Sequence, residues 1–204
     1  MNVSDLAVAG NVLFPFLRCL AHDMAAPLTS TLGYAQLNLQ SPGSPAELNE
    51  DLKQIEQSAL ALRAQLSRLS RLSRYVPGDT VSLAGELLKD LHSLSSSLAL
   101  SAGHHLEWDQ QENFDEEQLQ GNPWLMRVTC LAFLGSLCRK TESRVVVARR
   151  DGALALSFDP PEESGEESSP DKWGCPEVGE RLAASQALRL EKGDTWSLVL
   201  PICT

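Results

Sequence analysis

The sequence is short of basic residues. Its 204 residues include 17 Lys and Arg against 27 Asp and Glu, so its net charge is −10. Proteins that bind DNA, RNA or anionic lipid concentrate Lys and Arg where phosphates are contacted, so we expect no nucleic-acid partner. The negative excess is local: residues 1–76 contain six basic and six acidic residues, whereas residues 77–204 contain eleven and twenty-one.

Long apolar runs and closely paired cysteines are also missing. No stretch approaches the roughly twenty apolar residues that a membrane-spanning helix needs, and the apolar run from Leu6 to Leu20 is broken by Pro15 and Arg18. The five cysteines are odd in number and include no Cys-x-x-Cys pair, which favours reduced thiols over disulfides or metal ligands. We therefore expect a cytoplasmic protein with no membrane partner and no bound metal.

The apolar residues that are present, 43% of the chain, are spaced as in a helical hairpin. From Leu13 to Ala35 they recur every three or four residues. The breaker at residues 40–45 follows, and Ser44 with Glu47 matches a capping box that starts a second helix. That helix carries a strict four-three apolar repeat, the heptad signature of supercoiled helices: Leu48, Leu52, Ile55, Ala59, Leu62, Leu66 and Leu69.

One hairpin cannot cover both of its apolar stripes. We expect a second copy to cover them in a dimeric four-helix bundle; packing on the chain's own second half is the alternative. The predicted fold class is α+β, with a helical hairpin domain at 1–76 and an α/β sandwich domain at 77–204. In the second domain, helices are expected at 87–98 and 124–138, and strands at 80–83, 106–108, 144–149, 153–158 and 196–200.

The motif that is most informative about function surrounds His22. In the run LAHDMAAPLT an acid follows the histidine directly, and a Pro-Leu pair begins five residues after it. This run resembles the phosphoacceptor box of sensor histidine kinases: His22, Asp23, Met24 and the Pro27-Leu28 pair match, whereas the two alanines between them do not. The helical spacing turns His22 outward, and Pro27 predicts a kink or loosening just after it.

The resemblance implies roles for the residues of this box. His22 would accept a phosphoryl group, and Asp23 would orient its ring or accept its proton. Ala26 stands where kinases with phosphatase activity have a Thr or Asn that positions a water molecule, which implies transfer without hydrolysis. An ordinary surface histidine remains the alternative.

Four residues are candidates for contact with a protein partner. Ala26, Thr29 and Gly33 share the helix face of His22, and their small size would let a partner helix approach closely. Antiparallel geometry places Arg63 at roughly the level of His22, where it could contact an acidic partner. A solvated helix face is the simpler interpretation of this arginine and its neighbours.

The second domain resembles the ATP-binding domain of histidine kinases in the order of its elements, but its nucleotide motifs are replaced. Leu131 and Gly135 stand where the family has asparagines that help to hold Mg²⁺, a cation that needs oxygen ligands. Asp159 leads into Pro-Pro-Glu-Glu, not a glycine-rich turn, and residues 174–179 lack a close Gly-x-Gly pattern. Six acidic residues and no basic one between 159 and 171 would repel a triphosphate.

These features together predict a phosphorelay histidine phosphotransferase. It would pass a phosphoryl group between response-regulator receiver domains through His22, without productive ATP binding. We expect no cofactor on the chain itself, because the Mg²⁺ and the acyl phosphate would belong to the partner receiver. The alternative is a non-catalytic pseudokinase or scaffold that binds and regulates a two-component signalling partner. An ATP-dependent kinase fits poorly with the replaced nucleotide motifs.

Overall fold

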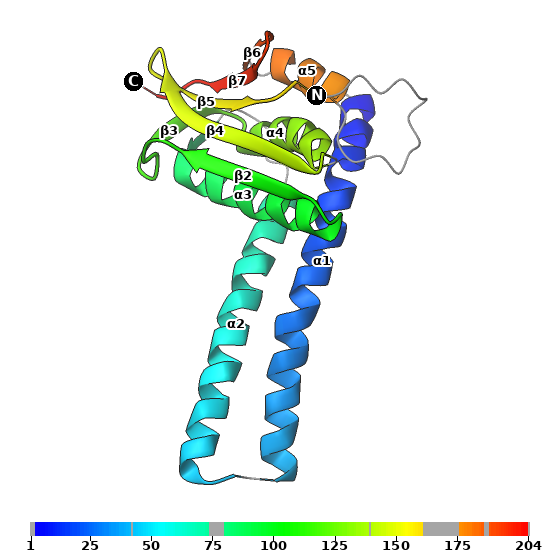
Figure 1. The fold of residues 1–204 in the computed structure, drawn as a ribbon, viewed down its shortest axis with the longest axis vertical. Coiled ribbons are helices and arrows are strands. Elements are labelled where there is room, and N and C mark those ends of the chain that lie inside the picture. Colours follow the sequence, from blue (N-terminus) through cyan, green and yellow to red (C-terminus); the bar gives the residue numbers. More distant parts are fainter. Residues whose placement is uncertain are drawn as a thin grey trace. The chain divides into compact units, whose positions relative to one another are not determined.

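The computed structural model describes residues 3–41, 43–73, 80–138, 140–160, 176–185 and 188–203. The chain forms two compact units, Leu17–Ser73 and Met1–Phe16 together with Arg74–Thr204. The first is a helical hairpin and the second an α/β domain (Figure 1), so the predicted α+β fold is confirmed. The first turns of the N-terminal helix group with the α/β unit, although the sequence pattern assigns them to the hairpin. The predicted boundary at residue 76 lies outside the described residues.

The hairpin consists of α1 (Val3–Gln40) and α2 (Pro45–Ser73). The predicted capping box starts α2: the Ser44 amide donates to Glu47 Oε2 at 2.7 Å, and the Glu47 amide donates to Ser44 Oγ at 3.4 Å. The hydrogen bond from the Ser44 backbone is the largest cause that lowers the pKa of Glu47. Pro27 does not interrupt α1, which is helical throughout its length. Thr31 Oγ1 donates to the Pro27 carbonyl at 2.9 Å.

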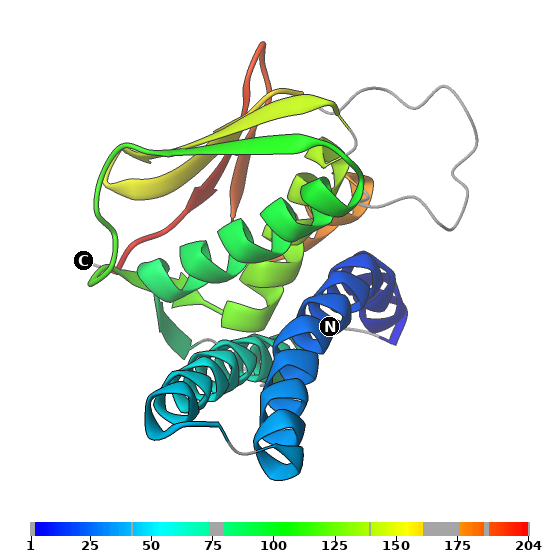
Figure 2. The same ribbon diagram turned by 60° about the horizontal axis from the view of Figure 1, so that its bottom comes forward.

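The α/β domain is built on a five-stranded sheet of order β2-β4-β5-β7-β6, in which only the β2–β4 pair is parallel. A separate antiparallel pair, β1–β3, lies apart from it. The helices α3 and α4 run along one face of the large sheet (Figure 2). The elements are β1 (Thr80–Leu83), α3 (Ala84–Ser101), β2 (His105–Gln110), β3 (Gln118–Gly121), α4 (Pro123–Leu137), β4 (Glu142–Arg150), β5 (Ala153–Phe158), α5 (Pro176–Ser185), β6 (Arg189–Glu191) and β7 (Trp196–Leu200).

The centre of this domain is α4, which is buried on every side from Trp124 to Leu137. Asn122 caps its first turn, since Oδ1 accepts hydrogen bonds from the amides of Trp124 and Leu125, each at 3.1 Å. An all-round apolar helix is the expected sign of complete burial. No face of α4 therefore remains open to solvent.

A buried ion pair joins α3 to α4. Arg127 Nε donates to Asp90 Oδ2 at 3.1 Å, and Arg127 Nη1 donates to the Pro123 carbonyl at 3.2 Å. The Arg127 and Asp90 side chains are only 6% and 3% exposed. Charges buried to this degree must be paired, so this contact fixes how the two helices pack.

Candidate functional site

His22 projects from α1 with 89% of its side chain exposed to solvent. Its Nδ1 atom lies 3.7 Å from Asp23 Oδ1, which is too long for a hydrogen bond but close enough for electrostatic attraction. A carboxylate beside Nδ1 favours the tautomer with its proton on that nitrogen. The lone pair on Nε2 is then directed away from Asp23, as a nucleophile requires.

Small side chains surround His22 on its face of α1. Ala26 and Thr29 are exposed, and Gly33 is half-buried. A Cβ atom added at Gly33 would meet nothing within 4 Å. These residues follow His22 by four, seven and eleven positions, the spacing of one helix face. The side chains next to the imidazole are therefore small and leave it accessible. Contact of these residues with a partner stays a prediction.

Two hydrogen bonds between α1 and α2 determine the register of the hairpin. Ser58 Oγ donates to Ser30 Oγ at 3.2 Å, and Asn38 Nδ2 donates to Asp51 Oδ2 at 2.9 Å. In an antiparallel pair of helices, a step of one residue forward along one helix is level with a step of one residue backward along the other. Either bond is therefore sufficient to locate the residues of α2 that are level with the histidine.

His22 lies level with Leu66 and Ser67 of α2 by this register. Arg63 comes level with Ala26, about one helical turn from His22. Its side chain is exposed, and the Arg63 carbonyl accepts a hydrogen bond from Ser67 Oγ at 3.0 Å. The predicted role of Arg63 toward an acidic partner remains untested by this geometry.

Many leucines of the hairpin remain uncovered in the single chain. The exposed fractions of Leu28, Leu52 and Leu66 are 46%, 53% and 49%. No residue of the predicted heptad repeat on α2 is buried. Exposed apolar stripes of this kind are typical of a surface that becomes covered, and both predicted coverings, a second copy and the chain's own second half, stay predictions.

Two residues that stand at positions of the family's nucleotide-binding motifs lie inside the α/β domain. Leu131 and Gly135 are buried in α4, and neither has an oxygen-bearing side chain for a cation. Asp159 is exposed after β5. The acidic residues between 162 and 171 and the glycine at position 174 lie outside the described residues.

Aromatic packing brings α4, α5 and the sheet together. The Phe133 ring centroid lies 5.7 Å from that of Phe158 and 6.3 Å from that of Trp196. A Cβ atom added at Gly179 of α5 would lie 2.7 Å from Phe133 Cε2. The glycine therefore allows α5 to approach Phe133 closely.

The described cysteines Cys19, Cys130, Cys138 and Cys203 are all free thiols, whereas Cys175 lies outside the described residues. Burial raises the pKa of Cys130 to about 12, so its thiol is unreactive at neutral pH.

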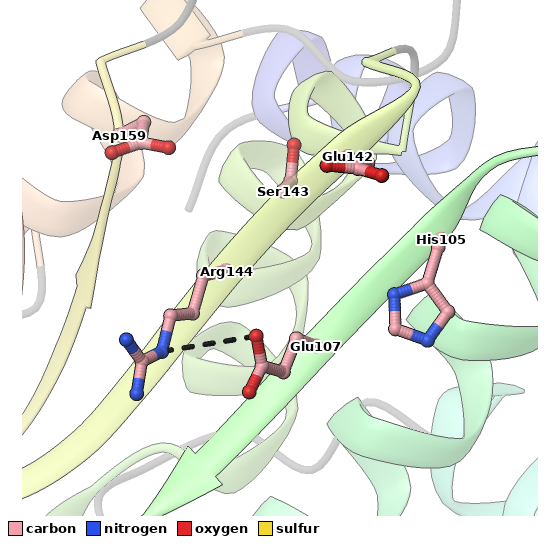
Figure 3. Close-up of a pocket in the computed structure, with 6 residues that line it drawn as sticks. All are labelled: His105, Glu107, Glu142, Ser143, Arg144 and Asp159. Atoms are coloured by element: carbon pink, nitrogen blue, oxygen red, sulfur yellow. Dashed lines mark ion pairs between the residues drawn. The ribbon is translucent and has the colours of Figure 1, made fainter.

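A polar hollow of about 410 Å³ lies at the end of the sheet formed by β2, β4 and β5. Arg144 points across it toward Glu107 (Figure 3), with 4.0 Å between Nε and Oε2, and Arg144 Nη2 lies 2.6 Å from Asp109 Oδ2. Within the described ranges, no three His, Cys, Asp or Glu side chains are placed to hold a metal ion. The hollow is lined by His105, Glu107, Glu142, Ser143, Arg144 and Asp159.

Comparison with known proteins identifies the hairpin. Residues 16–78 match the His Kinase A (phospho-acceptor) domain. No curated protein sequence matches the chain. Among the helices of the described residues, none has the length and apolarity needed to cross a bilayer.

Three solved structures are similar to the chain at low identity. The histidine kinase AdeS of Acinetobacter baumannii is 12% identical, with 89% of this chain and 96% of that chain covered and a TM-score of 0.42. A bacterial phosphotransferase is 12% identical, with 98% of each chain covered and a TM-score of 0.40. The catalytic domain of histidine kinase ThkA is 7% identical, with 62% and 95% covered and a TM-score of 0.46.

Such low similarity leaves the function to be argued from the residues of this chain. The resemblance to the histidine kinase core is confirmed where it is most specific: residues 16–78 match the phospho-acceptor domain of histidine kinases, and His22 lies within them.

Proposed function

We propose that this protein is a histidine phosphotransferase of a two-component phosphorelay in the cytoplasm. The observation that carries the proposal is the exposed His22 imidazole, which lies inside the matched phospho-acceptor segment with Asp23 beside Nδ1. A phosphoacceptor needs an accessible nitrogen lone pair and a fixed tautomer. The exposed ring supports the first requirement, and the Asp23 carboxylate, 3.7 Å from Nδ1, would favour the tautomer with its proton on that nitrogen.

The proposed reaction takes a phosphoryl group from an aspartyl phosphate on a receiver domain. The Nε2 lone pair of His22 forms a bond to phosphorus, and the bond from phosphorus to the aspartyl oxygen breaks, with its electrons going to the carboxylate. The proton on Nδ1 stays on the ring and faces Asp23, whose charge stabilises the imidazolium that forms. The receiver supplies Mg²⁺. Transfer to a second receiver is the reverse of this step.

Ala26 favours transfer over hydrolysis in this proposal. It follows His22 by one helical turn and is exposed, but its methyl group cannot hold a water molecule in line with the phosphorus. The phosphorylated histidine would therefore keep its phosphoryl group until a receiver removes it.

The direct test is phosphoryl transfer from a panel of labelled, phosphorylated receivers to the protein in the absence of ATP. Label on the protein, and its release on addition of an unphosphorylated receiver, would support the proposal. A scaffold or pseudokinase would bind receivers in a pull-down but take up no label. Absence of label from every receiver would therefore contradict the phosphotransferase assignment.

We expect the α/β domain not to bind Mg-ATP. By the resemblance, Leu131 and Gly135 stand where the family has asparagines, the last of which helps to hold Mg²⁺, and Phe133 packs against Phe158, Trp196 and α5. Isothermal titration should give no saturable heat up to about 1 mM Mg-ATP. Micromolar binding, or labelling of His22 by γ-labelled ATP, would show instead that the chain is an unusual kinase.

We also propose that the hairpin dimerises through the exposed leucines. Both helices display them on the same side, so a second copy would cover both stripes in a four-helix bundle. Introducing two carboxylates with Leu52→Glu and Leu66→Glu should convert the dimer to a monomer, because charges cannot be buried unpaired. Light scattering after gel filtration measures the mass.

The matched control places the same charges on the other side of α2, with Ala61→Glu and Ala64→Glu. This variant should remain dimeric. A wild-type protein of monomer mass, or equal dimerisation of both double variants, would contradict the proposed interface.

A further inference from the structure

The register and rotation of the hairpin place Arg68 beside His22. The Ser30–Ser58 hydrogen bond marks the line along which α1 and α2 face each other. His22 precedes Ser30 by eight residues and is rotated about 80° from that line. Arg68 follows Ser58 by ten residues and is rotated about 80° in the same sense. Equal rotations about two antiparallel helices lead to the same side of the pair.

The levels of the two residues also agree. Because His22 lies level with Leu66 and Ser67, Arg68 is displaced from it along the hairpin by only about two residues, or roughly 3 Å. The two residues therefore lie on the same side of the hairpin at nearly the same level.

Arg63 lies on the opposite side. It follows Ser58 by five residues and is rotated about 140° in the other sense, toward the side that carries Leu62 and Leu66. Of these two arginines of α2, only Arg68 shares the side of the hairpin that carries His22. The heptad pattern gives the rotation of each arginine about α2 but not its level relative to His22, because it contains no information on the register between helices.

The side chain of Arg68 is held in place by a neighbour. Arg68 Nη1 donates to Gln65 Oε1 at 3.0 Å, and the residue is half-buried along the helix pair. A guanidinium fixed in this way offers a planar set of N–H donors that suits phosphate oxygens.

We propose that Arg68 binds the phosphoryl group during its transfer to and from His22. The inference rests on the proposed phosphotransferase function and adds a second residue, from α2, to the site. As the bond to Nε2 forms and the bond to the aspartyl oxygen breaks, negative charge is spread over the three equatorial phosphoryl oxygens. The Arg68 guanidinium donates to one or two of these oxygens and stabilises that charge. It neither gains nor loses a proton in the step.

The experiment compares Arg68→Gln, Arg68→Lys and the matched control Lys53→Gln with the wild-type protein. Lys53 is an exposed cation of α2 that lies nearly four helical turns from the level of His22. Single-turnover transfer from a phosphorylated receiver is followed by rapid quench over a range of receiver concentrations. Arg68→Gln should lower the maximal rate by about 100-fold, the effect of losing one charged donor to a developing oxyanion. Arg68→Lys should recover part of that loss, while Lys53→Gln stays within about twofold of wild type.

Unchanged melting temperatures of the variants would exclude a folding defect, and Arg68→Lys provides the comparison if Arg68→Gln is unstable. Equal maximal rates for Arg68→Gln and Lys53→Gln would overturn the role of Arg68 and leave the phosphotransferase function intact. If Arg68→Gln raised only the receiver concentration that gives half of the maximal rate and left the maximal rate unchanged, the role of Arg68 would also be overturned. Arg68 would then bind the receiver and not the phosphoryl group. Failure of the wild-type protein to accept label would instead overturn both proposals.

Discussion

Replacement of His22 by Gln is expected to reduce labelling of the protein by phosphorylated receivers to background. Glutamine keeps the polarity and approximate size of the exposed side chain but has no nitrogen lone pair that can attack phosphorus. The side chain is 89% exposed, so its loss should leave the hairpin folded. Labelled protein separated on a gel measures the effect, and the wild-type label should be acid-labile and alkali-stable, as expected of a phosphohistidine.

Two controls make this result specific. Circular dichroism of the variant should match the wild type, and Asp23→Asn should slow the transfer without abolishing it, because the carboxylate orients the ring and is not the nucleophile. Label that persists on the His22→Gln protein would locate the acceptor elsewhere, for example at His92, His104 or His105, and would remove the central residue of the proposal.

Asp90→Ala is expected to destabilise the α/β domain by about 3–5 kcal/mol, the usual cost of leaving a buried charge without its partner. Arg127 would keep its guanidinium at 6% exposure with only the Pro123 carbonyl as a known acceptor. Urea unfolding, followed by tryptophan fluorescence, measures the change, since the four tryptophans of the chain all lie in this domain.

The adjacent residue provides the control for this prediction. Lys89→Ala removes the surface pair with Asp115, whose side chains are 70% and 52% exposed, and should change stability by less than about 1 kcal/mol. Replacing both buried partners, with Asp90→Leu and Arg127→Met, should restore most of the stability. Similar losses for Asp90→Ala and Lys89→Ala would show that the buried pair does not determine the packing of α3 on α4.

Periodicity and turn chemistry were sufficient to predict the hairpin from the sequence. The apolar spacing of α1 and α2, and the reciprocal bonds of Ser44 and Glu47, are local properties that the structure confirms. The strands β4, β5 and β7 were also predicted, because each is a run of β-branched and apolar residues with turns on either side. The elements β3, β6 and α5 were not, since β3 and β6 each contain a single leucine and Gly179 lowers the helix propensity of α5.

The features that the sequence did not predict depend on contacts between distant parts of the chain. Asp90 and Arg127 are 37 positions apart, and nothing near either residue indicates that they pair. The level of Arg63 and Arg68 relative to His22 depends on the Ser30–Ser58 and Asn38–Asp51 contacts. The heptad repeat gives the rotation of each helix, but the register between helices comes from contacts that only the fold reveals.

The aromatic packing around Phe133 has a consequence for how the domain responds to the cell. A domain that binds a nucleotide gains stability with nucleotide concentration, by RT ln(1 + [L]/Kd). Here Phe133, Phe158 and Trp196 contact one another, and Gly179 lets α5 close on them. If the domain binds no nucleotide, as proposed, its stability has no such term, and the protein would fold equally well in starved and well-fed cells, independent of their energy charge.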